Sequence, residues 1–231
     1  MRFYIPKLLL ATALPRQTAP QDKFGGLPWG LPPERWPICA GCGGYQSLLA
    51  QLGSDVQHFD LGPGSSGLLI FQCENGRGCA TFNPESGCNA VLFLAPGEEG
   101  SWFTPSPNDN LSIVPEARIV GWVESEDRIT PAEAEAFMSH EAFFDLDEDL
   151  VESVSPVTRM GSVPAWIQSP QRPEGTGWRF MFQLDCEYVL SSDPQGVGVL
   201  EAMNFGDSGR GYLFLRTAGS HPEGRFLWQC S

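Results

Sequence analysis

The sequence predicts an α+β fold: a single β-rich domain over residues 1–231, built from two tandem duplicated strand units with an acidic helical insert between them. Three observations lead to this prediction: a repeated pattern, short apolar runs bounded by glycine and proline, and one segment with helix signals. The chain has 231 residues, 42% of them hydrophobic, which is enough for a full core. Its 26 glycines and 20 prolines favour turns and short elements over long helices.

A repeated pattern divides the chain into two units. Each copy begins with a basic residue, followed by an apolar residue, Gly, a small residue, an apolar residue, Pro and Trp. The matched pairs, in chain order, are residues 23–29 with 159–166, 48–52 with 180–184, and 69–73 with 226–230. Because the order is shared, a duplication of about 20–95 and 158–231 is favoured over the convergence of common strand–turn patterns.

Within these units, the short runs rich in Leu and aromatic residues are predicted strands. LLIFQC (68–73) and AVLFLA (90–95) are continuous apolar runs, as expected of strands that are buried on both faces. The Gly-Pro-Trp pieces predict bends that place a Trp over the sheet. At the start of the chain, a first strand is favoured over a signal peptide, because the small residues 11–13 fall inside the apolar run instead of after it.

The acidic insert, residues 124–153, contains eleven Asp and Glu against one Arg, and so carries ten of the fourteen net negative charges. Thr130, Pro131 and Glu133 have the types expected of an N-cap, a first helical position and a capping box. The sequence therefore predicts a helix over residues 132–144. Two interpretations stay open: a solvated helix that links the two units, or an acidic docking surface for a basic partner.

The net charge of −14 argues against nucleic-acid binding, which requires Lys and Arg to neutralise phosphates. The same charge disfavours an anionic membrane surface, and no apolar run approaches the roughly 20 residues that cross a bilayer. Seven cysteines are an odd number, and two of them form a C-x-x-C pair. Both facts favour a reducing compartment, so a cytoplasmic location is predicted.

The cysteines of the first unit predict a metal site. Cys39-Ala-Gly-Cys42 has the form of a glycine-rich knuckle, and a second, looser pair follows about thirty residues later. The set predicted to hold a structural zinc ion through four thiolates is Cys39, Cys42, Cys73 and Cys79. Cys88 is a possible substitute ligand, while Cys186 and Cys230 lie in apolar strand contexts and are predicted core residues. A redox C-x-x-C pair and incidental buried thiols stay open as alternatives.

Residues 206–209, GDSG, match the letters around the nucleophilic serine of trypsin-like proteases. That chemistry also needs a positioned histidine, an Asp that orients it and an oxyanion hole. The three histidines, at 58, 140 and 221, lie in a polar loop, the acidic segment and a turn. Ser208 is therefore predicted to lie in a turn that delivers the chain into a strand, and no catalytic residue is assigned.

Several stretches together resemble the YwqG-like proteins, the domain of unknown function 1963. They are KFGGLPW (23–29), WPICAGCGGYQSLLAQL (36–52), RMGSVPAWIQ (159–168), NFGDSGRGYLF (204–214) and FLWQC (226–230). The resemblance implies a mixed α+β fold with a tandem duplication, and it implies no activity. The family is similar in turn to the group of programmed cell death protein 2, whose members are dedicated chaperones that hold a basic ribosomal protein. Bacterial members also occur near toxin genes, which implies a possible immunity role.

The resulting functional prediction is a cytoplasmic protein-binding module, chaperone-like or with an interaction or immunity role, that contains a structural zinc. Its predicted partner is a basic or extended protein segment, with no nucleic acid and no membrane. The seven tryptophans mostly lie near Pro or Gly, where core and turn packing explain them, although an aromatic groove for a peptide is an alternative. The alternative function is an enzyme, with a hydrolase that uses Asp207, Ser208 or a cysteine as the candidate.

Overall fold

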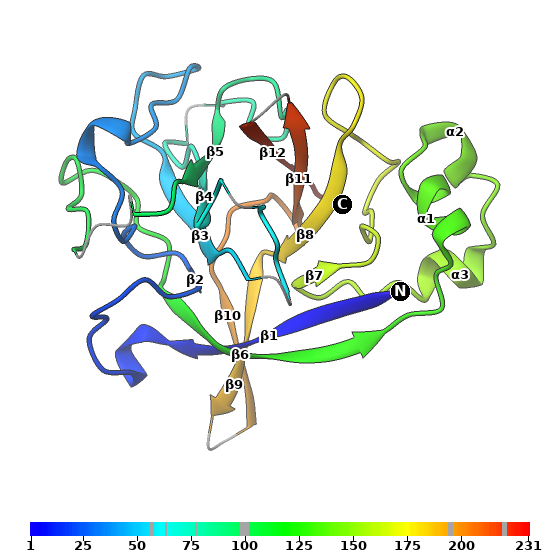
Figure 1. Cartoon of the computed structure of the whole chain (residues 1–231), viewed down its shortest axis with the longest axis horizontal. Helices are drawn as coiled ribbons and strands as arrows, with labels where there is room; N and C mark the ends of the chain where they lie inside the picture. Colours follow the sequence, from blue (N-terminus) through cyan, green and yellow to red (C-terminus); the bar gives the residue numbers. More distant parts are fainter. Residues whose placement is uncertain (56–57, 63, 77, 98–101, 194–195, 219–220) are drawn as a thin grey trace.

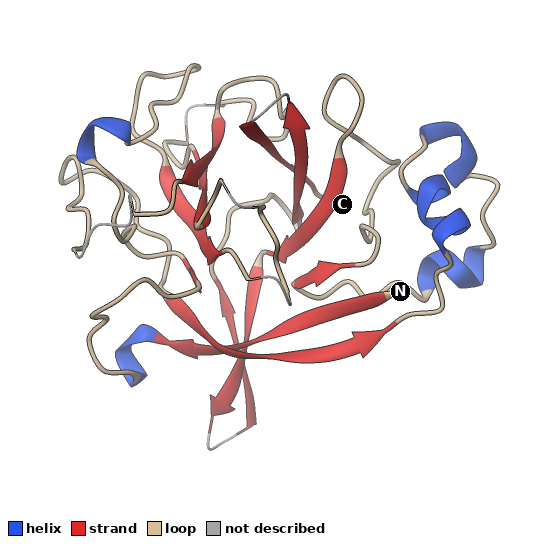
Figure 2. Ribbon diagram, in the orientation of Figure 1, coloured by secondary structure: helices blue, strands red, loops and turns tan. Residues whose placement is uncertain are grey.

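Strands dominate the fold (Figure 1 and Figure 2). The computed structural model describes residues 1–231 except 56–57, 63, 77, 98–101, 194–195 and 219–220. The strands are β1 (Arg2–Leu10), β2 (Lys23–Phe24), β3 (Ser47–Gly53), β4 (Gly67–Gln72), β5 (Asn89–Leu94), β6 (Ala117–Glu126), β7 (Arg159–Gly161), β8 (Arg179–Asp185), β9 (Glu187–Asp193), β10 (Gly196–Glu201), β11 (Arg210–Ala218) and β12 (His221–Gln229). The helical elements are η1 (Ala11–Ala13), η2 (Pro33–Arg35), α1 (Pro131–Phe137), α2 (His140–Phe143) and α3 (Glu148–Glu152). The predicted strand-rich fold and the predicted first strand are confirmed.

The strands form one continuous sheet in the order β12-β11-β8-β7-β1-β6-β2-β3-β4-β5. β9 joins it through a parallel bridge between Leu8 and Leu190, and β10 pairs with β9. The sheet curls until its two end strands lie beside each other, where the side-chain amide of Asn89 on β5 donates to the carbonyl of Phe226 on β12 over 2.9 Å. The largely antiparallel sheet is therefore nearly closed.

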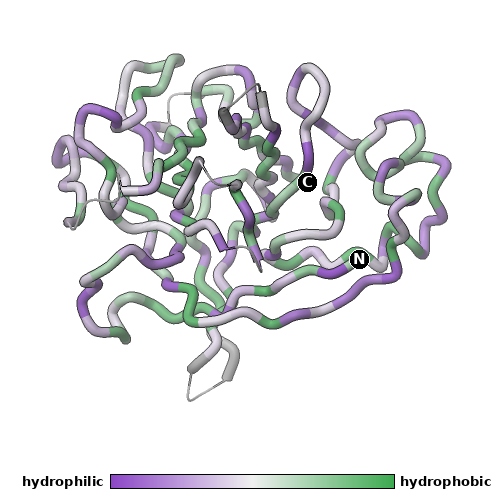
Figure 3. Tube along the Cα trace, in the orientation of Figure 1, coloured by the Kyte–Doolittle hydropathy of each residue, from purple (hydrophilic) through white to green (hydrophobic). Residues whose placement is uncertain are grey.

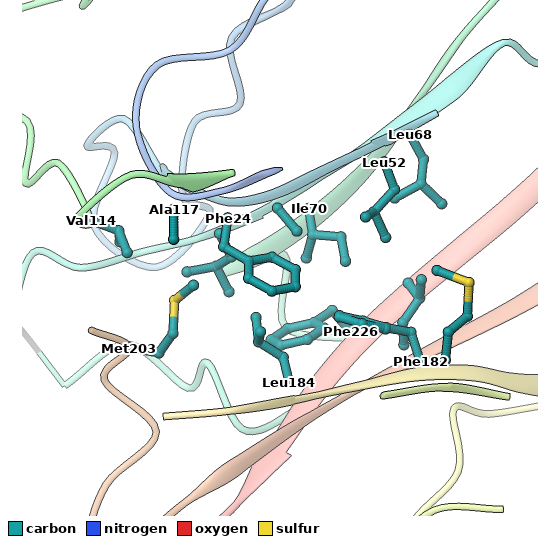
Figure 4. Packing of buried hydrophobic residues seen from close by; sticks show 14 of the residues in the cluster. Phe24, Leu52, Leu68, Ile70, Val114, Ala117, Phe182, Leu184, Met203 and Phe226 are labelled. Carbon is teal, nitrogen blue, oxygen red and sulfur yellow. The ribbon is translucent and has the colours of Figure 1, made fainter. Parts of the chain in front are cut away.

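The sheet has two arms that pack face to face. The first arm consists of β2, β3, β4 and β5, and the second consists of β7, β8, β11 and β12. Phe24 and Ile70 from the first arm meet Phe182 and Phe226 from the second, and each is at most 1% exposed (Figure 4). Figure 3 shows that hydrophobic residues concentrate along these strands. Burial of this shared apolar surface holds the arms together.

The two arms repeat the same local hydrogen bonds. In the first arm, the Gln51 side chain accepts from the backbone N–H of Trp29 at 2.8 Å; in the second, Gln183 accepts from Ala165 at 2.9 Å. The bend that precedes the strand of each glutamine comprises residues 23–29 in the first arm and 159–166 in the second. In each bend a buried cation donates to the backbone carbonyl four residues later: Lys23 to Leu27, and Arg159 to Val163. These contacts fix each bend against the strand that follows it.

The arms also share a pairing irregularity. Between β3 and β4 the register skips Leu49, and between β8 and β11 it skips Met181. The two residues hold the same position, because Lys23 pairs with Gln51 and Arg159 pairs with Gln183, each two residues further along. A β-bulge of this kind bends and twists its strand, so both arms curve at the same place.

Two details of the predicted strands are wrong. Residues 226–229 lie on β12, an end strand, whereas residues 69–72 lie on β4, which pairs with both β3 and β5. These stretches therefore do not hold equivalent positions. The strand at the β4 position of the second arm is β11. β4 is fully buried as predicted, but residues 89–93 on β5 are only partly buried, since β5 ends the sheet path.

The segment between β6 and β7 forms α1, α2 and α3 (Figure 1). The Thr130 capping box is present: its side chain accepts from the N–H of Glu133, whose side chain accepts in return from the N–H of Thr130. The predicted single helix over 132–144 is wrong, because Ser139 caps a new helix by accepting from the N–H of Ala142. No helix in the described part of the chain is both long and apolar enough to span a membrane.

Replacing Asp22 with Asn is expected to stabilise the fold at neutral pH by about 1 kcal/mol. Burial raises the pKa of Asp22, although its side chain accepts from the N–H of Gly53 at 2.6 Å. In the second arm, the neutral hydroxyl of Thr158 makes the matching bond to Asp185 at 2.8 Å. An Asn side chain keeps an oxygen that accepts from the N–H of Gly53 and removes the buried charge. The second arm indicates that a neutral acceptor is enough to hold the bend.

The gain of Asp22→Asn should depend on pH. Because the folded pKa lies above the unfolded one, the wild-type carboxyl stabilises the fold below its unfolded pKa and loses that contribution as pH rises through the folded pKa. Urea unfolding of both proteins at pH 7 and pH 3.5 measures this. A variant that is less stable than wild type at pH 7 would show that the charge itself supports the bend.

Candidate metal centre

Four cysteine thiols of the first arm converge on one point. The sulfur atoms of the cluster all lie within 4.8 Å of one another, and the residues are Cys39, Cys42, Cys73 and Cys79. The Sγ atom of Cys73 is 3.6 Å from that of Cys42 and 3.7 Å from that of Cys79. Four sulfurs at about 2.3 Å from a zinc ion would be about 3.8 Å apart in a tetrahedron, so the spacing suits such an ion.

A short hairpin positions the first two thiols. Ile38 and Tyr45 form a β-bridge, and between them the N–H of Cys39 donates to the carbonyl of Gly44 at 2.8 Å. The N–H of Gly43 donates back to the carbonyl of Cys39 at 2.8 Å, and Gly43 has a φ of +73°. Only glycine adopts this backbone conformation easily, so the glycines of the motif allow the tight turn that brings the thiols together.

The sheet positions the other thiols. Cys73 directly follows β4, and Cys88 directly precedes β5. The N–H of Cys73 donates to the carbonyl of Cys88 at 2.9 Å, which extends the β4–β5 ladder by one pair. Cys79 lies in the loop between these strands. The cluster is therefore attached to the rigid end of the first arm, and its second half comes from a single loop.

Hydrogen bonds prepare one thiol to ionise. The N–H of Gly44 and the side-chain amide of Asn75, each 3.4 Å from its sulfur, lower the pKa of Cys42 to about 6. Burial has the opposite effect elsewhere: it raises the pKa of Cys79 to about 11, and it also raises the pKa of Cys39. The thiols of Cys39 and Cys79 are thus costly to ionise without a cation, and a bound metal ion supplies that charge.

A fifth thiol, Cys88, lies against the cluster. A side chain on Gly41 would come within 3.1 Å of the Cys88 sulfur and within 3.4 Å of the Cys79 sulfur. Burial opposes ionisation of Cys88, but hydrogen bonds, including one from Ser86, outweigh it and lower its pKa. Cys88 is thus close enough to replace a ligand, although its sulfur is not one of the four that lie within 4.8 Å of one another.

Comparison with known proteins gives one match. The profile of the family described as Domain of unknown function (DUF1963) matches residues 22–221. The chain belongs to this family. No match was found among curated proteins, and none among solved structures. The whole cysteine cluster and the first arm lie inside the matched region of this DUF1963 protein, as do β7, β8 and β11, whereas β12 lies beyond it except for its first residue.

The remaining cysteines of the DUF1963 chain lie outside the cluster. Cys186 is buried in the core between the arms, as predicted, and Cys230 is partly buried beside Gly206. All seven cysteines are free thiols. The four clustered thiols could hold a metal ion, and with all four engaged they would leave it no position for a substrate.

The GDSG stretch of the DUF1963 chain forms a turn before β11, as predicted. Ser208 has a φ of +48°, and a side chain on Gly209 would lie 1.8 Å from the carbonyl oxygen of Phe205. His58 is bonded to Asp55 and His140 packs against Phe144, so neither is placed beside Ser208 as a base. The turn therefore has the backbone demands of a chain reversal, and neither histidine whose side chain is described is placed as the base of a serine protease.

One cavity could not have been found from the sequence. It is lined by aromatic residues that lie more than seventy positions apart, Trp29 with Trp102 and Phe103. The only signal in the sequence was the high number of tryptophans beside Gly and Pro.

Proposed function

We propose that the chain is a binding module for a basic protein segment, with a structural zinc ion. The observation that carries this proposal is the placement of acidic residues on the short helices α1 to α3. The exposed carboxylates of these helices and of the connection between α2 and α3 belong to Glu135, Glu141, Asp145, Asp147, Glu148, Asp149 and Glu152. A surface of one charge sign attracts partners of the opposite sign and speeds their association.

The acidic helices are held firmly enough to present a surface. Phe137, Ile129 and Val154 form a small apolar cluster with Val163 and Ala165 of the second bend. The indole N–H of Trp166 donates to the carbonyl of Phe137 at 2.8 Å, which ties α1 to that bend. A preorganised surface loses little conformational entropy when a partner binds.

An apolar residue stands among these charges. Phe144 is 66% exposed and lies between the acidic residues of α2 and α3. Beside the helices, Glu133, Asp147 and Asp149 line a shallow cavity of about 420 Å³ together with Arg128 and Leu150. An exposed aromatic residue within a charged rim is the usual composition of a protein-binding hot spot. A partner segment with Lys or Arg around one apolar side chain fits this surface.

We infer that the metal held by the cysteine cluster is zinc. Zinc accepts four thiolates in a tetrahedron, and its structural sites are closed in this way. The glycine-rich knuckle, the convergence of four sulfurs and the amide donors to Cys42 support this identity. Its role would be to stiffen the end of the first arm.

We also infer that the two arms are tandem copies and that residues 124–153 are an acidic insert between them. The matched side-chain bonds of Gln51 and Gln183 and the matched bulges at Leu49 and Met181 support the duplication. β1 and β6, which lie outside the two repeats, pair with each other, and they also pair with β7 of the second arm and β2 of the first, respectively. This shared pair of strands would explain why both arms fold as one domain.

Removing acidic charge from α3 is expected to weaken partner binding by about tenfold at low salt, because rim charges act mainly through long-range attraction. The variant replaces Asp147, Glu148 and Asp149 with amides, and the control neutralises Glu187 and Glu201 on β9 and β10. Tagged wild type and variants are used to capture proteins from the host extract at low and high salt. Captured proteins are then purified and their affinities measured.

The captured proteins and their affinities decide between the proposed roles. Recovery of one basic protein supports an interaction or immunity role, and recovery of several supports a chaperone-like role. Equal affinity of the α3 variant and the control variant would remove the acidic surface as the contact. If wild type captures no basic protein at low salt, the proposed function is wrong.

A further inference from the structure

A cavity of about 520 Å³ lies beside the bend of the first arm, and neither the cysteine cluster nor the acidic helices contribute to it. The residues that line it are Arg16, Gln17, Thr18, Trp29, Trp102 and Phe103. A volume of this size is typical of a site for a small ligand or for one large side chain.

The aromatic wall of the cavity is fixed by backbone hydrogen bonds. Trp29 and Phe103 form a β-bridge, and the N–H of Gly30 donates to the carbonyl of Trp102 at 2.9 Å. The rings of Trp29 and Phe103 meet edge to face at 4.8 Å. Trp102 is held in the same short ladder, yet its side chain is 52% exposed. The wall therefore offers a rigid, partly uncovered aromatic surface on which a planar apolar group can stack.

Arg16 is the charged residue of the lining. It is exposed and makes no ion pair with any residue that the structure describes. Gln17, in contrast, is already engaged: its amide donates to the carbonyl of Ala19, and its oxygen accepts from Lys23. The indole Nε1 of Trp29 is buried and out of a ligand's reach, so Trp29 contributes its ring to the wall. A ligand of this site must therefore supply acceptors to Arg16, which a negative charge suits.

We propose that this cavity binds a planar apolar group that carries a carboxylate. The apolar group stacks on Trp102, and the carboxylate accepts from Arg16. Two sources have this chemistry: a small free acid that carries an aromatic ring, or the C-terminal aromatic residue of a peptide. The site goes beyond the proposed function, because it needs neither the acidic helices nor the metal ion.

The test follows the indole N–H resonances of the isotopically labelled protein by NMR, with the Trp29 resonance assigned from a Trp29→Phe variant. The probes are N-acetyl-phenylalanine, its neutral amide, and the peptide Gly-Gly-Gly-Phe with either a free or an amidated C-terminus. We expect a saturable shift of the Trp29 resonance for the carboxylates, with a dissociation constant of about 1 mM for the first probe. The amidated partners should bind about tenfold more weakly.

The relative affinities of N-acetyl-phenylalanine and the free-carboxylate peptide distinguish the two sources. Arg16→Gln and Trp102→Ala should each weaken binding about tenfold, because both side chains lie at the exposed rim and contact the ligand directly. Arg172→Gln and Phe82→Ala, which remove an exposed base and an equally exposed aromatic ring elsewhere, should leave binding unchanged. The proposal is overturned if no carboxylate shifts the Trp29 resonance, or if acid and amide bind equally. Partner capture does not enter this test, so the two proposals can fail separately.

Discussion

Replacing Cys39 with serine is expected to release the metal ion and to destabilise the fold by at least about 3 kcal/mol. Cys39 is 1% exposed, and its sulfur belongs to the group of four that lie within 4.8 Å of one another. Serine cannot supply a thiolate, and it leaves three thiols that repel one another once they ionise. Binding energy of a structural zinc ion is folding energy, so both losses should appear together.

The loss should spread from the cluster into the first arm. Cys73 and Cys88 extend the β4–β5 ladder, and the loop between them supplies Cys79. Without the metal, that loop loses its anchor, and β5 at the end of the sheet should exchange its amide hydrogens faster than β3. Hydrogen exchange of wild type before and after treatment with a chelator measures this difference.

Matched variants separate metal binding from the loss of any thiol. Cys73→Ser should behave like Cys39→Ser, with elemental analysis showing near one zinc per chain in wild type and none in either variant. Cys230→Ser, which changes a partly buried thiol outside the cluster, should keep the metal and the stability. A wild-type protein that folds fully without any metal would falsify the zinc proposal.

Cys88→Ser decides which thiols are the ligands. If the four clustered sulfurs hold the ion, this variant keeps the metal with a modest loss of stability, because Cys88 is 2% exposed. Complete loss of metal in Cys88→Ser, with retention in Cys42→Ser, would instead assign Cys88 as the ligand and remove Cys42.

The cysteine cluster was predictable because its spacing reflects local chemistry. A C-x-x-C pair with glycines forms its knuckle from neighbouring residues, and the second pair flanks a strand end that the apolar run LLIFQC already marks. The sequence identified Cys88 as a substitute ligand but could not rank it against the four predicted ligands, because its distance from their sulfurs depends on how β4 and β5 pair. Long-range pairing of this kind is not encoded in any short window.

The helices show where local signals compete. The capping box at Thr130 was predictable from three residues, yet the helix after it ends at Phe137 because Ser139 offers a second cap. Phe137 and Phe144 are the same residue type in the sequence, but Phe137 is buried and Phe144 is exposed. The apolar pattern therefore could not indicate this break. The hairpin of β9 and β10 was missed altogether, because its backbone pairing with β1 is limited to a single parallel bridge to Leu8.

The buried bases at the start of each bend were noticed in the sequence only as part of a repeat, and their role is structural. Lys23 and Arg159 are both fully buried. Each binds a carbonyl within its own bend and a carboxylate from a distant segment: Lys23 lies 2.9 Å from Glu116, and Arg159 lies 3.5 Å from Asp127. Burial lowers the pKa of Arg159 to about 10, so its guanidinium stays charged at neutral pH.

Replacing either base with methionine is therefore expected to destabilise the fold by about 3 kcal/mol, because each change leaves a buried carbonyl and a carboxylate without their cation. Exchanging the two bases should cost less: Arg159→Lys and Lys23→Arg keep the charge, and each arm already shows that the other side chain serves at the equivalent position. Urea unfolding of the four variants measures this order. If Arg159→Lys were as damaging as Arg159→Met, the planar guanidinium and its contact with the Phe3 ring at 4.8 Å would be the requirement, and the two bends would not be interchangeable in this respect. If both methionine variants cost less than about 1 kcal/mol, the bends would be held by the bonds of Gln51 and Gln183 alone.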